Sequence, residues 1–351
     1  MPDSSGFLGE KRMRNNVIFK INPEKIDSKK IKIAARSIRQ GKLVAFPTET
    51  VYGLGSDVFN ARAVLKIFKI KGRPGNDPLI VHISEKETLF NLAKEIPEEA
   101  MKLIDEFWPG PLTVVLKKSN IVPDIVTAGL DTIAIRMPRN AIALNLIKFA
   151  GTPVAAPSAN LFGRPSPTCA QHVIDDLTGK VDIILDGGRT EIGLESTVVD
   201  MTRRPFRILR PGGITMKEIR RLLGKVELNS DESDIIRSPG VLPHHYSPKA
   251  KLLLVEKGNG QINEMKRLAL NFKKQGKNIG IMVTSENQNK FNGFKIQVIG
   301  SINDSRTCAF NLFSILRSFD KEKVDVIIAE GIGLRGLGLT IMDRLRKASN
   351  S

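Results

Sequence analysis

The sequence predicts an α/β protein with two domains: a larger domain on a twisted, mixed sheet and a smaller, Rossmann-like domain. The chain has 351 residues, and at about 150 residues per domain two domains are expected. Hydrophobic residues make up 41% and charged residues 26% of the chain, which excludes a mainly disordered, collagenous or coiled-coil protein. Short apolar runs alternate with helical patterns along most of the chain, as is typical of α/β folds.

The first domain is expected over residues 17–225. Its first helix, over residues 28–40, carries Ile31, Ala35 and Ile38 on one face. The pattern then predicts a strand at 42–46, a helix capped by Asn60 and ended near Gly72, a strand at 79–83, and a helix opened by Ser84 with Glu87. Further strands are expected at 112–116, 132–137, 153–156, 181–185, 196–200 and 206–209, with helices near 97–107, 140–149, 168–178 and 215–223.

The second domain is expected over residues 251–351. Before it, residues 226–250 have acids, serines and prolines with little periodicity, which is the composition of a linker. Strands are then predicted at 252–255, 279–284, 294–299 and 324–329, with helices near 261–274, 303–319 and 338–347. This alternation favours a small parallel sheet. Residues 1–16 lack the apolar core of a secretory signal and are expected to be a flexible tail.

Charge and cysteine content narrow the class of protein. The chain has 54 Lys and Arg against 37 Asp and Glu, a net charge of +17, which favours anionic partners such as nucleotide phosphates, nucleic acid or a membrane surface. No window reaches the roughly 18 apolar residues that a membrane-spanning helix needs. Two cysteines, Cys169 and Cys308, cannot form a disulfide framework or a cysteine-rich zinc site. We therefore expect a cytoplasmic protein.

Polar residues follow several predicted strands, where α/β folds form their ligand crevices. Thr48 and Thr50 lie in FPTETVYGLG, where Gly53 and Gly55 would let a ligand approach the backbone; an ordinary polar turn is the alternative. The stretch KGRPGNDP carries Lys71, Arg73 and Asp77 and is followed by His82. Its cations could instead compensate a helix dipole, and the histidine could be structural.

Two further cations and a set of hydroxyls complete the candidates. Arg136 lies inside an apolar strand and needs an anionic partner, from the protein or from a ligand; with no acid in that strand, a substrate carboxylate or phosphate is one expected partner and a protein acid from elsewhere is the other. Arg210 ends another strand. Hydrogen-bonding side chains occur at Ser158, Asn160, Ser166, Ser196 and Thr197.

In their order along the chain, these segments resemble the Sua5/YciO/YrdC family. The likeness lies in FPTETVYGLG, KGRPGNDPLIVHI, APSANLFGRPSPT, ESTVVD and RILRPG. HHYSPKA and the final GLGLTIMDRLRKAS resemble the long Sua5 form. The resemblance implies a YrdC-like catalytic domain, a linker with an HYSP motif and a Sua5 C-terminal domain.

The resemblance also implies a reaction, the synthesis of threonylcarbamoyl-AMP. L-Threonine, bicarbonate (or CO2) and ATP would give L-threonylcarbamoyl-AMP and pyrophosphate, for the t6A modification of adenosine 37 in tRNAs that read ANN codons. Mg2+ is expected with ATP, bridging phosphate oxygens, with no organic cofactor and no protein metal site. tRNA or a downstream threonylcarbamoyl-transferase are further candidate partners.

Site residues follow from the resemblance position by position. The K-x-R and S-x-N signatures imply catalytic roles for Lys71, Arg73, Ser158 and Asn160. The positions that resemble threonine contacts are Thr50, His82, Arg136, the backbone at Ala156, and Ser196. Those that resemble ATP contacts are Arg73, Asp77, Thr132, Ser158, Ser166 and Arg210, with Tyr246 closing over the nucleotide. Asp77 departs from the family pattern, and its carboxylate must face a cation or Mg2+.

Two other functions remain open at this point. A non-catalytic double-stranded RNA or tRNA binder would use the positive charge, although one Trp and two Tyr supply few stacking surfaces. The related carbamoyl-transfer branch of hydrogenase maturation carries zinc-finger cysteines, which two cysteines cannot provide.

Overall fold

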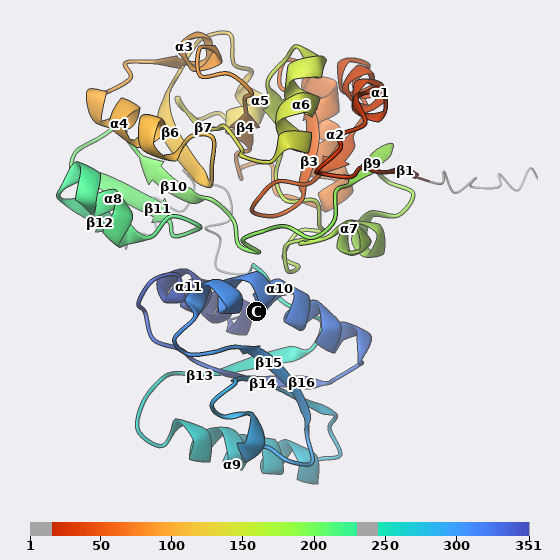
Figure 1. The fold of residues 1–351 in the computed structure, drawn as a ribbon, viewed down its shortest axis with the longest axis vertical. Coiled ribbons are helices and arrows are strands. Elements are labelled where there is room, and N and C mark those ends of the chain that lie inside the picture. Colours follow the sequence, from red (N-terminus) through yellow and green to blue (C-terminus); the bar gives the residue numbers. More distant parts are fainter. Residues whose placement is uncertain (1–15, 230–244, 351) are drawn as a thin grey trace, which may run out of the picture.

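The computed structural model describes residues 16–229 and 245–350, which form two α/β units (Figure 1). The predicted tail, except Asn16, and residues 230–244 of the predicted linker lie outside the described residues. Asn16 accepts a hydrogen bond from the backbone N–H of Gly179 at 2.8 Å. Within the described residues, no helix is long and apolar enough to cross a membrane.

The first unit is built on a mixed sheet. Its strands are β1 (Val17–Lys20), β2 (Val44–Phe46), β3 (Gly53–Asp57), β4 (Ile80–His82), β5 (Ala93–Lys94), β6 (Leu112–Lys118), β7 (Thr132–Arg136), β8 (Val154–Ala155), β9 (Ile183–Asp186), β10 (Thr197–Asp200), β11 (Phe206–Arg210) and β12 (Val226–Leu228). They pair in the order β1-β9-β2-β3-β8-β4-β7-β6-β10-β11-β12, with β5 beside β6. Because both parallel and antiparallel pairs occur along this order, the predicted mixed sheet is confirmed.

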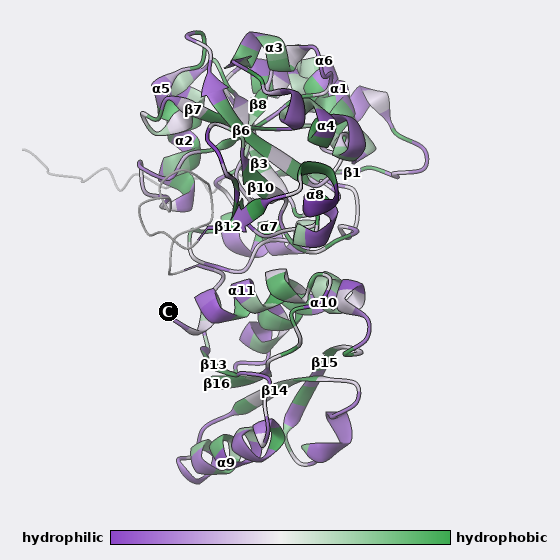
Figure 2. Ribbon diagram, turned by 90° about the vertical axis from the view of Figure 1, so that its left-hand side faces the viewer, coloured by the Kyte–Doolittle hydropathy of each residue, from purple (hydrophilic) through white to green (hydrophobic). Residues whose placement is uncertain are grey.

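Helices cover both faces of this sheet. They are α1 (Ser28–Arg39), α2 (Ala61–Lys71), α3 (Thr88–Leu92), α4 (Glu98–Phe107), α5 (Asp124–Thr127), α6 (Ala141–Ala150), α7 (Ala170–Leu177) and α8 (Met216–Leu223). Helices α1 and α6 share one apolar cluster with β2 and β9, and α2, α4 and α7 belong to another. The predicted helix signals are confirmed for α2: Asn60 caps its first turn, and Gly72 ends it with φ 65°. Figure 2 shows the apolar residues gathered on the strands and inner helix faces.

The structure contradicts two local expectations and limits a third. The stretch FPTETVYGLG runs into β3, and its Thr48 and Gly53 line the pocket described below, whereas a Cβ on Gly55 would lie 2.8 Å from the Phe46 ring, so Gly55 allows close strand packing. Ser84 opens no helix, since α3 begins only at Thr88. The predicted linker starts too early, because Val226–Leu228 pairs in parallel with β11 as the last strand of the sheet.

The second unit is a four-stranded parallel sheet, as predicted. Its elements are β13 (Lys251–Val255), α9 (Gln261–Lys274), β14 (Ile279–Thr284), a short 3-10 turn η2 (Gln288–Lys290), β15 (Lys295–Gly300), α10 (Ser305–Lys321), β16 (Val326–Glu330) and α11 (Gly338–Ser349). The strand order is β13-β16-β14-β15. Helix α9 covers one face, while α10 and α11 cover the face toward the first unit (Figure 1).

The two units meet through a continuous interface. Arg317 of α10 forms a buried ion pair with Asp176 of α7 at 2.7 Å. Gly193 has φ +79°, and a Cβ there would lie 2.7 Å from both the Cα and the carbonyl oxygen of Phe310 in α10. An apolar cluster includes Val51 of the first unit together with α10 and α11. The interface therefore fixes how α10 and α11 lie against the first sheet.

Candidate functional site

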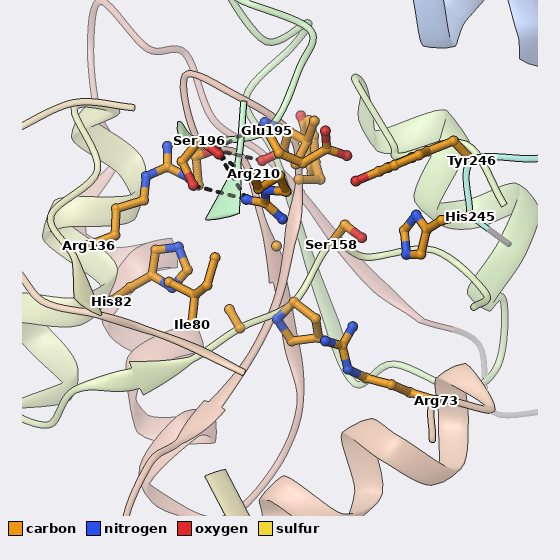
Figure 3. A pocket seen from close by; sticks show the side chains of 16 residues that line it. Arg73, Ile80, His82, Arg136, Ser158, Glu195, Ser196, Arg210, His245 and Tyr246 are labelled. Atoms are coloured by element: carbon orange, nitrogen blue, oxygen red, sulfur yellow. Dashed lines mark hydrogen bonds between the residues drawn. The ribbon is translucent and has the colours of Figure 1, made fainter. Parts of the chain in front are cut away.

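A pocket lies at one end of the first sheet, beside the second unit. It is lined by Thr48, Val51, Tyr52, Gly53, Arg73, Ile80, His82, Arg136, Ala156, Pro157, Ser158, Glu195, Ser196, Arg210, His245 and Tyr246. The space between these walls is about 510 Å³, its open mouth included. Figure 3 shows Arg136 and His82 on one side of it, and Arg73, His245 and Tyr246 on the other.

The mixed sheet explains how these residues meet. His82, Arg136 and Arg210 are the last residues of β4, β7 and β11. Ser196 precedes β10, which is parallel to β6, and β6 is antiparallel to β7. The amino end of β10 therefore lies at the same end of the sheet as the carboxyl end of β7, with β6 between them, and Ser196 joins the pocket from a strand of opposite direction.

Arg73 is held by the segment that follows it. Its Nη2 lies 2.7 Å from Oδ1 of Asp77, and it donates to the carbonyl oxygens of Asp77 and Pro78 at 3.0 and 2.8 Å. Burial lowers the pKa of Arg73, and the Asp77 carboxylate opposes that shift. Asp77 thus faces a cation, as its charge requires, and this cation belongs to the protein.

Arg136 has a partner that the sequence analysis missed. Its Nη2 donates to Oε1 of Glu49 at 2.7 Å, and both side chains are buried. Of the two expected kinds of partner, protein acid or ligand, the structure supplies a protein acid: Glu49 comes from the turn between β2 and β3, 87 positions earlier. The signal was the single acid in FPTETVYGLG.

Arg210 is tied to the backbone of the same pocket. It donates to the Ser196 carbonyl oxygen through Nε at 3.3 Å and Nη2 at 3.0 Å, and to the Ser196 hydroxyl at 3.1 Å (Figure 3). The Ser196 hydroxyl also lies 2.7 Å from that of Thr113. Burial lowers the pKa of Arg210, while Tyr246 and Glu195 oppose the shift.

Lys71 and Asn160 lie behind the pocket wall. The Lys71 ammonium donates to the carbonyl oxygens of Ser158 and Asn160, each at 2.5 Å. Burial, with Arg73 nearby, holds the pKa of Lys71 well below its usual value. The Asn160 amide donates to the carbonyl oxygens of Leu161 and Arg164. In this arrangement both side chains shape the loop that presents Ser158.

The second unit reaches the pocket through Arg344 of α11. Its Nε donates to Oε2 of Glu195 at 2.9 Å, its Nη2 to the Pro211 carbonyl oxygen at 2.9 Å, and its guanidinium lies 4.9 Å from the Tyr246 ring centre. Ser166 donates to the other Glu195 oxygen at 2.5 Å. Burial would raise the pKa of Glu195, but Arg344, Arg210 and Ser166 bring it below its usual value. The sequence analysis named neither Glu195 nor Arg344 as a site residue.

Four of the expected threonine and ATP contacts do not line the pocket: Thr50, Asp77, Thr132 and Ser166. Thr50 places its hydroxyl 2.7 Å from that of Thr48, which does line the pocket. Thr132 begins β7 and Arg136 ends it, so their backbones are about 13 Å apart at about 3.3 Å per residue. Thr132 pairs with Lys117 and is the one expected contact that the structure leaves at a distance.

The pocket histidines are uncharged at neutral pH. Burial, with Arg136 nearby, lowers the pKa of His82 to about 3. Burial, with Arg73 and Lys71, holds the pKa of His245 well below its usual value. The His245 ring packs edge-on against Tyr246, and Tyr246 stacks on Phe313 of α10, with centroids 4.1 and 5.4 Å apart. These rings form a neutral wall opposite the Arg136 side.

The pocket suits anionic ligands, because three arginines from separate elements face it and each is anchored by the chain. Its acids are engaged: Asp77 with Arg73, Glu49 with Arg136, and Glu195 with Arg344. Throughout residues 16–229 and 245–350, no group of three His, Cys, Asp or Glu side chains is placed to hold a metal ion. A Mg2+ ion in this pocket would need oxygen ligands from a bound phosphate, since these carboxylates are paired with arginines.

Comparisons with known proteins give the family. Residues 36–212 match the Sua5_yciO_yrdC family model, described as "Telomere recombination", and residues 214–350 match the model of the threonylcarbamoyl-AMP synthase C-terminal domain. The chain is 47% identical to the threonylcarbamoyl-AMP synthase of Pyrococcus abyssi, over 93% of this chain and 96% of that protein. It is 44% identical to the synthase of Bacillus subtilis, over 90% and 92%.

Solved structures agree. The crystal structure of P. abyssi Sua5 complexed with L-threonine aligns with a TM-score of 0.90 at 47% identity, over 95% of this chain and 98% of that one. E. coli YciO aligns with a TM-score of 0.53 at 25% identity, over 58% of this chain and 99% of that one. The first unit therefore has the fold shared by both proteins, and the likeness to Sua5 extends through the second unit.

Proposed function

The chain belongs to the Sua5/YciO/YrdC family in its two-domain form, and from that premise we propose that it is a threonylcarbamoyl-AMP synthase. In this reaction the threonine amine and bicarbonate give a carbamate and water. A carbamate oxygen then attacks the α-phosphorus of ATP, and the bond to pyrophosphate breaks. The product, L-threonylcarbamoyl-AMP, supplies the t6A modification at adenosine 37 of tRNAs that read ANN codons.

The observation that carries this proposal is the set of anchored arginines around one pocket. Carbamate and ATP are both anions, so bringing them together is opposed by their charge. Once the carbamate exists, no strong general base is needed, and positioning with charge neutralisation supplies the catalysis. Arg73, Arg136 and Arg210 face the space where the two reactants would meet. Bound with ATP, Mg2+ would neutralise further phosphate charge.

We assign threonine to the side with Arg136, His82 and Ser196. Arg136 can pair with the substrate carboxylate through two N–H groups. His82 is neutral, so it can accept a hydrogen bond from the substrate amine without adding charge. Serine differs from threonine by one methyl group, worth about 1–3 kcal/mol, so we expect it to be a weaker substrate.

We assign ATP to the side with Arg73, Arg210 and Ser158. Arg73 and Arg210 would neutralise phosphate oxygens, and Tyr246 and His245 would cover the nucleotide. The pyrophosphate that leaves carries several negative charges, so these arginines stabilise the leaving group as well as the bound triphosphate. Lys71 and Asn160 would act through the loop that they hold rather than by direct contact.

The test is pyrophosphate release from ATP by the purified protein. We expect release only when L-threonine, bicarbonate and Mg2+ are all present, with a product of the mass of threonylcarbamoyl-AMP. Serine in place of threonine should give slower release. Release that continues unchanged without threonine would contradict the proposal. Salt-sensitive RNA binding without turnover would favour the non-catalytic RNA binder, which the relatives do not favour.

A further inference from the structure

Glu49 is a buried acid with no role in the site as the sequence predicts it. Its side chain is 0% exposed, and its two carboxylate oxygens have different partners. Oε1 accepts from Arg136 Nη2 at 2.7 Å, and Oε2 accepts from the backbone N–H of Arg139 at 3.1 Å. One carboxylate therefore fixes both the guanidinium at the end of β7 and the loop that follows it.

The turn that carries Glu49 is itself held in place. The Thr48 hydroxyl accepts hydrogen bonds from the backbone N–H groups of Thr50 and Val51 at 3.1 and 3.2 Å. The Glu49 carbonyl oxygen accepts from the backbone N–H of Ile192 at 2.9 Å. Because the backbone is fixed on both sides, the position of the carboxylate is fixed too.

These contacts leave part of the Arg136 guanidinium for a ligand. Arg136 donates from Nη2 to Glu49 and from Nε to the Gly110 carbonyl oxygen at 3.3 Å. A guanidinium has five N–H groups, and three make no hydrogen bond to residues 16–229 or 245–350. A two-point contact with a carboxylate takes one N–H from each of two nitrogens, and Nη1 together with the second N–H of Nη2 can supply it, since Arg136 lines the pocket (Figure 3).

We propose that Glu49 is a positioning residue that sets the orientation of Arg136 for the α-carboxylate of the amino-acid substrate; this rests on the proposed function. A freely rotating cation would attract any anion, phosphate included. A guanidinium held at two points presents a fixed fork that matches a planar carboxylate. The Glu49 carboxylate also offsets part of the Arg136 charge, so the orientation of the guanidinium, in addition to its charge, distinguishes threonine from the nucleotide phosphates.

The experiment compares Glu49→Gln and Glu49→Asp with the wild-type protein. The matched control is Glu191→Gln, which removes an exposed acid paired with Arg139 in the same loop. The measurements are KM for L-threonine, KM for ATP, and inhibition by L-threoninol, which has a hydroxymethyl group in place of the carboxylate.

Glu49→Gln is expected to raise KM for threonine about 10- to 100-fold, the size expected when charge-assisted hydrogen bonds lose their geometry. KM for ATP should change less than about threefold, and inhibition by threoninol should stay near the wild-type level because threoninol does not use the fork. Glu49→Asp keeps the charge and should recover part of the loss. Glu191→Gln should match the wild type in all three measurements.

Three results would overturn the proposal. One is a threonine KM within about twofold of wild type in Glu49→Gln. Another is an equal rise in threonine KM, ATP KM and the threoninol inhibition constant, which would indicate general damage to the pocket. If Glu49→Gln does not fold, Glu49→Asp decides: a selective threonine defect supports the proposal and wild-type constants overturn it. A wild-type protein without threonine-dependent turnover would instead contradict the proposed function.

Discussion

Both units carry charged or polar side chains at the carboxyl ends of their strands, but only in the first unit do these side chains line the pocket. In the first unit, His82, Arg136 and Arg210 end three strands and face an open pocket. In the second, Glu330 ends β16, but its carboxylate accepts from the Thr284 backbone N–H at 2.7 Å and the Asn287 amide at 2.6 Å. Polar strand ends therefore do not by themselves make a site. In the second unit the hydrogen bonds from Thr284 and Asn287 occupy the Glu330 carboxylate, so this strand end offers a ligand no unpaired carboxylate oxygen.

The second unit contributes to the pocket from a helix instead. Arg344 projects from α11 to Glu195 and Tyr246. Helices α10 and α11 lie between the small sheet and the first unit (Figure 1). The arginines of the first unit line the pocket, whereas Arg344 of the second unit supports the pocket wall through Glu195 and Tyr246. Substitutions can therefore test the two roles separately.

Removing the Arg73 charge should have the largest effect. Arg73→Ala alone would remove one member of a buried ion pair, which costs about 3–5 kcal/mol of stability. The double variant Arg73→Met/Asp77→Asn removes both charges and should stay folded while pyrophosphate release falls at least about 100-fold, since phosphate neutralisation is lost. Thermal unfolding and the pyrophosphate assay check the two parts. Full turnover by the double variant would remove Arg73 from the mechanism.

Removing the Arg344 side chain should mainly lower the stability of the fold. Arg344→Ala leaves Glu195 buried without its ion-pair partner, and we expect the free energy of unfolding to fall by about 3–5 kcal/mol. Arg346→Ala on the same helix removes a half-exposed pair with Glu256 and should cost less than about 1 kcal/mol. Denaturant titration measures both. Equal losses in the two variants would mean that the contact with Glu195 carries no special weight.

Mild acid, between pH 7.5 and 5, should weaken the first unit more than the second, because residues 251–351 contain no histidine. Burial lowers the pKa of His82 to about 3 and that of His172 to about 4. In the unfolded chain these side chains bind protons near pH 6.5, so folding stability falls as the pH drops below 6.5, by up to about 1.4 kcal/mol per pH unit for each. Urea unfolding between pH 7.5 and 5 should show this slope. His172→Gln should reduce it, and an unchanged slope would assign the acid sensitivity to other groups.

The smallest effect is expected from a substitution of Glu330, at the end of β16 in the second unit. Glu330→Gln should lower the free energy of unfolding by about 1–2 kcal/mol, since hydrogen bonds to a charged acceptor become neutral ones. KM for threonine and ATP should not change. A rise in either constant would show that the carboxyl edge of the second sheet takes part in catalysis after all.

Local periodicity was enough to predict most of the fold. The apolar repeat predicts α9 at residues 261–274, the range that the helix has, and Asn60 and Gly72 mark the ends of α2. The apolar pattern does not predict elements whose conformation depends on contacts between distant segments. Strand β3 contains two glycines and little apolar alternation, and Gly55 packs where a Cβ would lie 2.8 Å from the Phe46 ring.

The site was predictable only as far as its motifs reach. Most motif residues do meet in one pocket, but their partners come from far along the chain. Glu49 lies 87 positions from Arg136, and Glu195 lies 149 positions from Arg344. Such pairs leave no periodic trace in a single sequence. For the same reason the sequence could not show that Lys71 and Asn160 lie behind the wall and Thr132 at the far end of its strand.

The interface between the two units leaves no room for a methyl group at Gly193. Alanine there would push its side chain against the backbone of α10, which cannot rotate aside as a side chain can. A single added carbon would act as a wedge, lifting α10 together with Arg317 and Phe313, and through Phe313 the stacked ring of Tyr246. The absence of a side chain at Gly193 thus determines how closely Phe313 and Tyr246 approach the pocket.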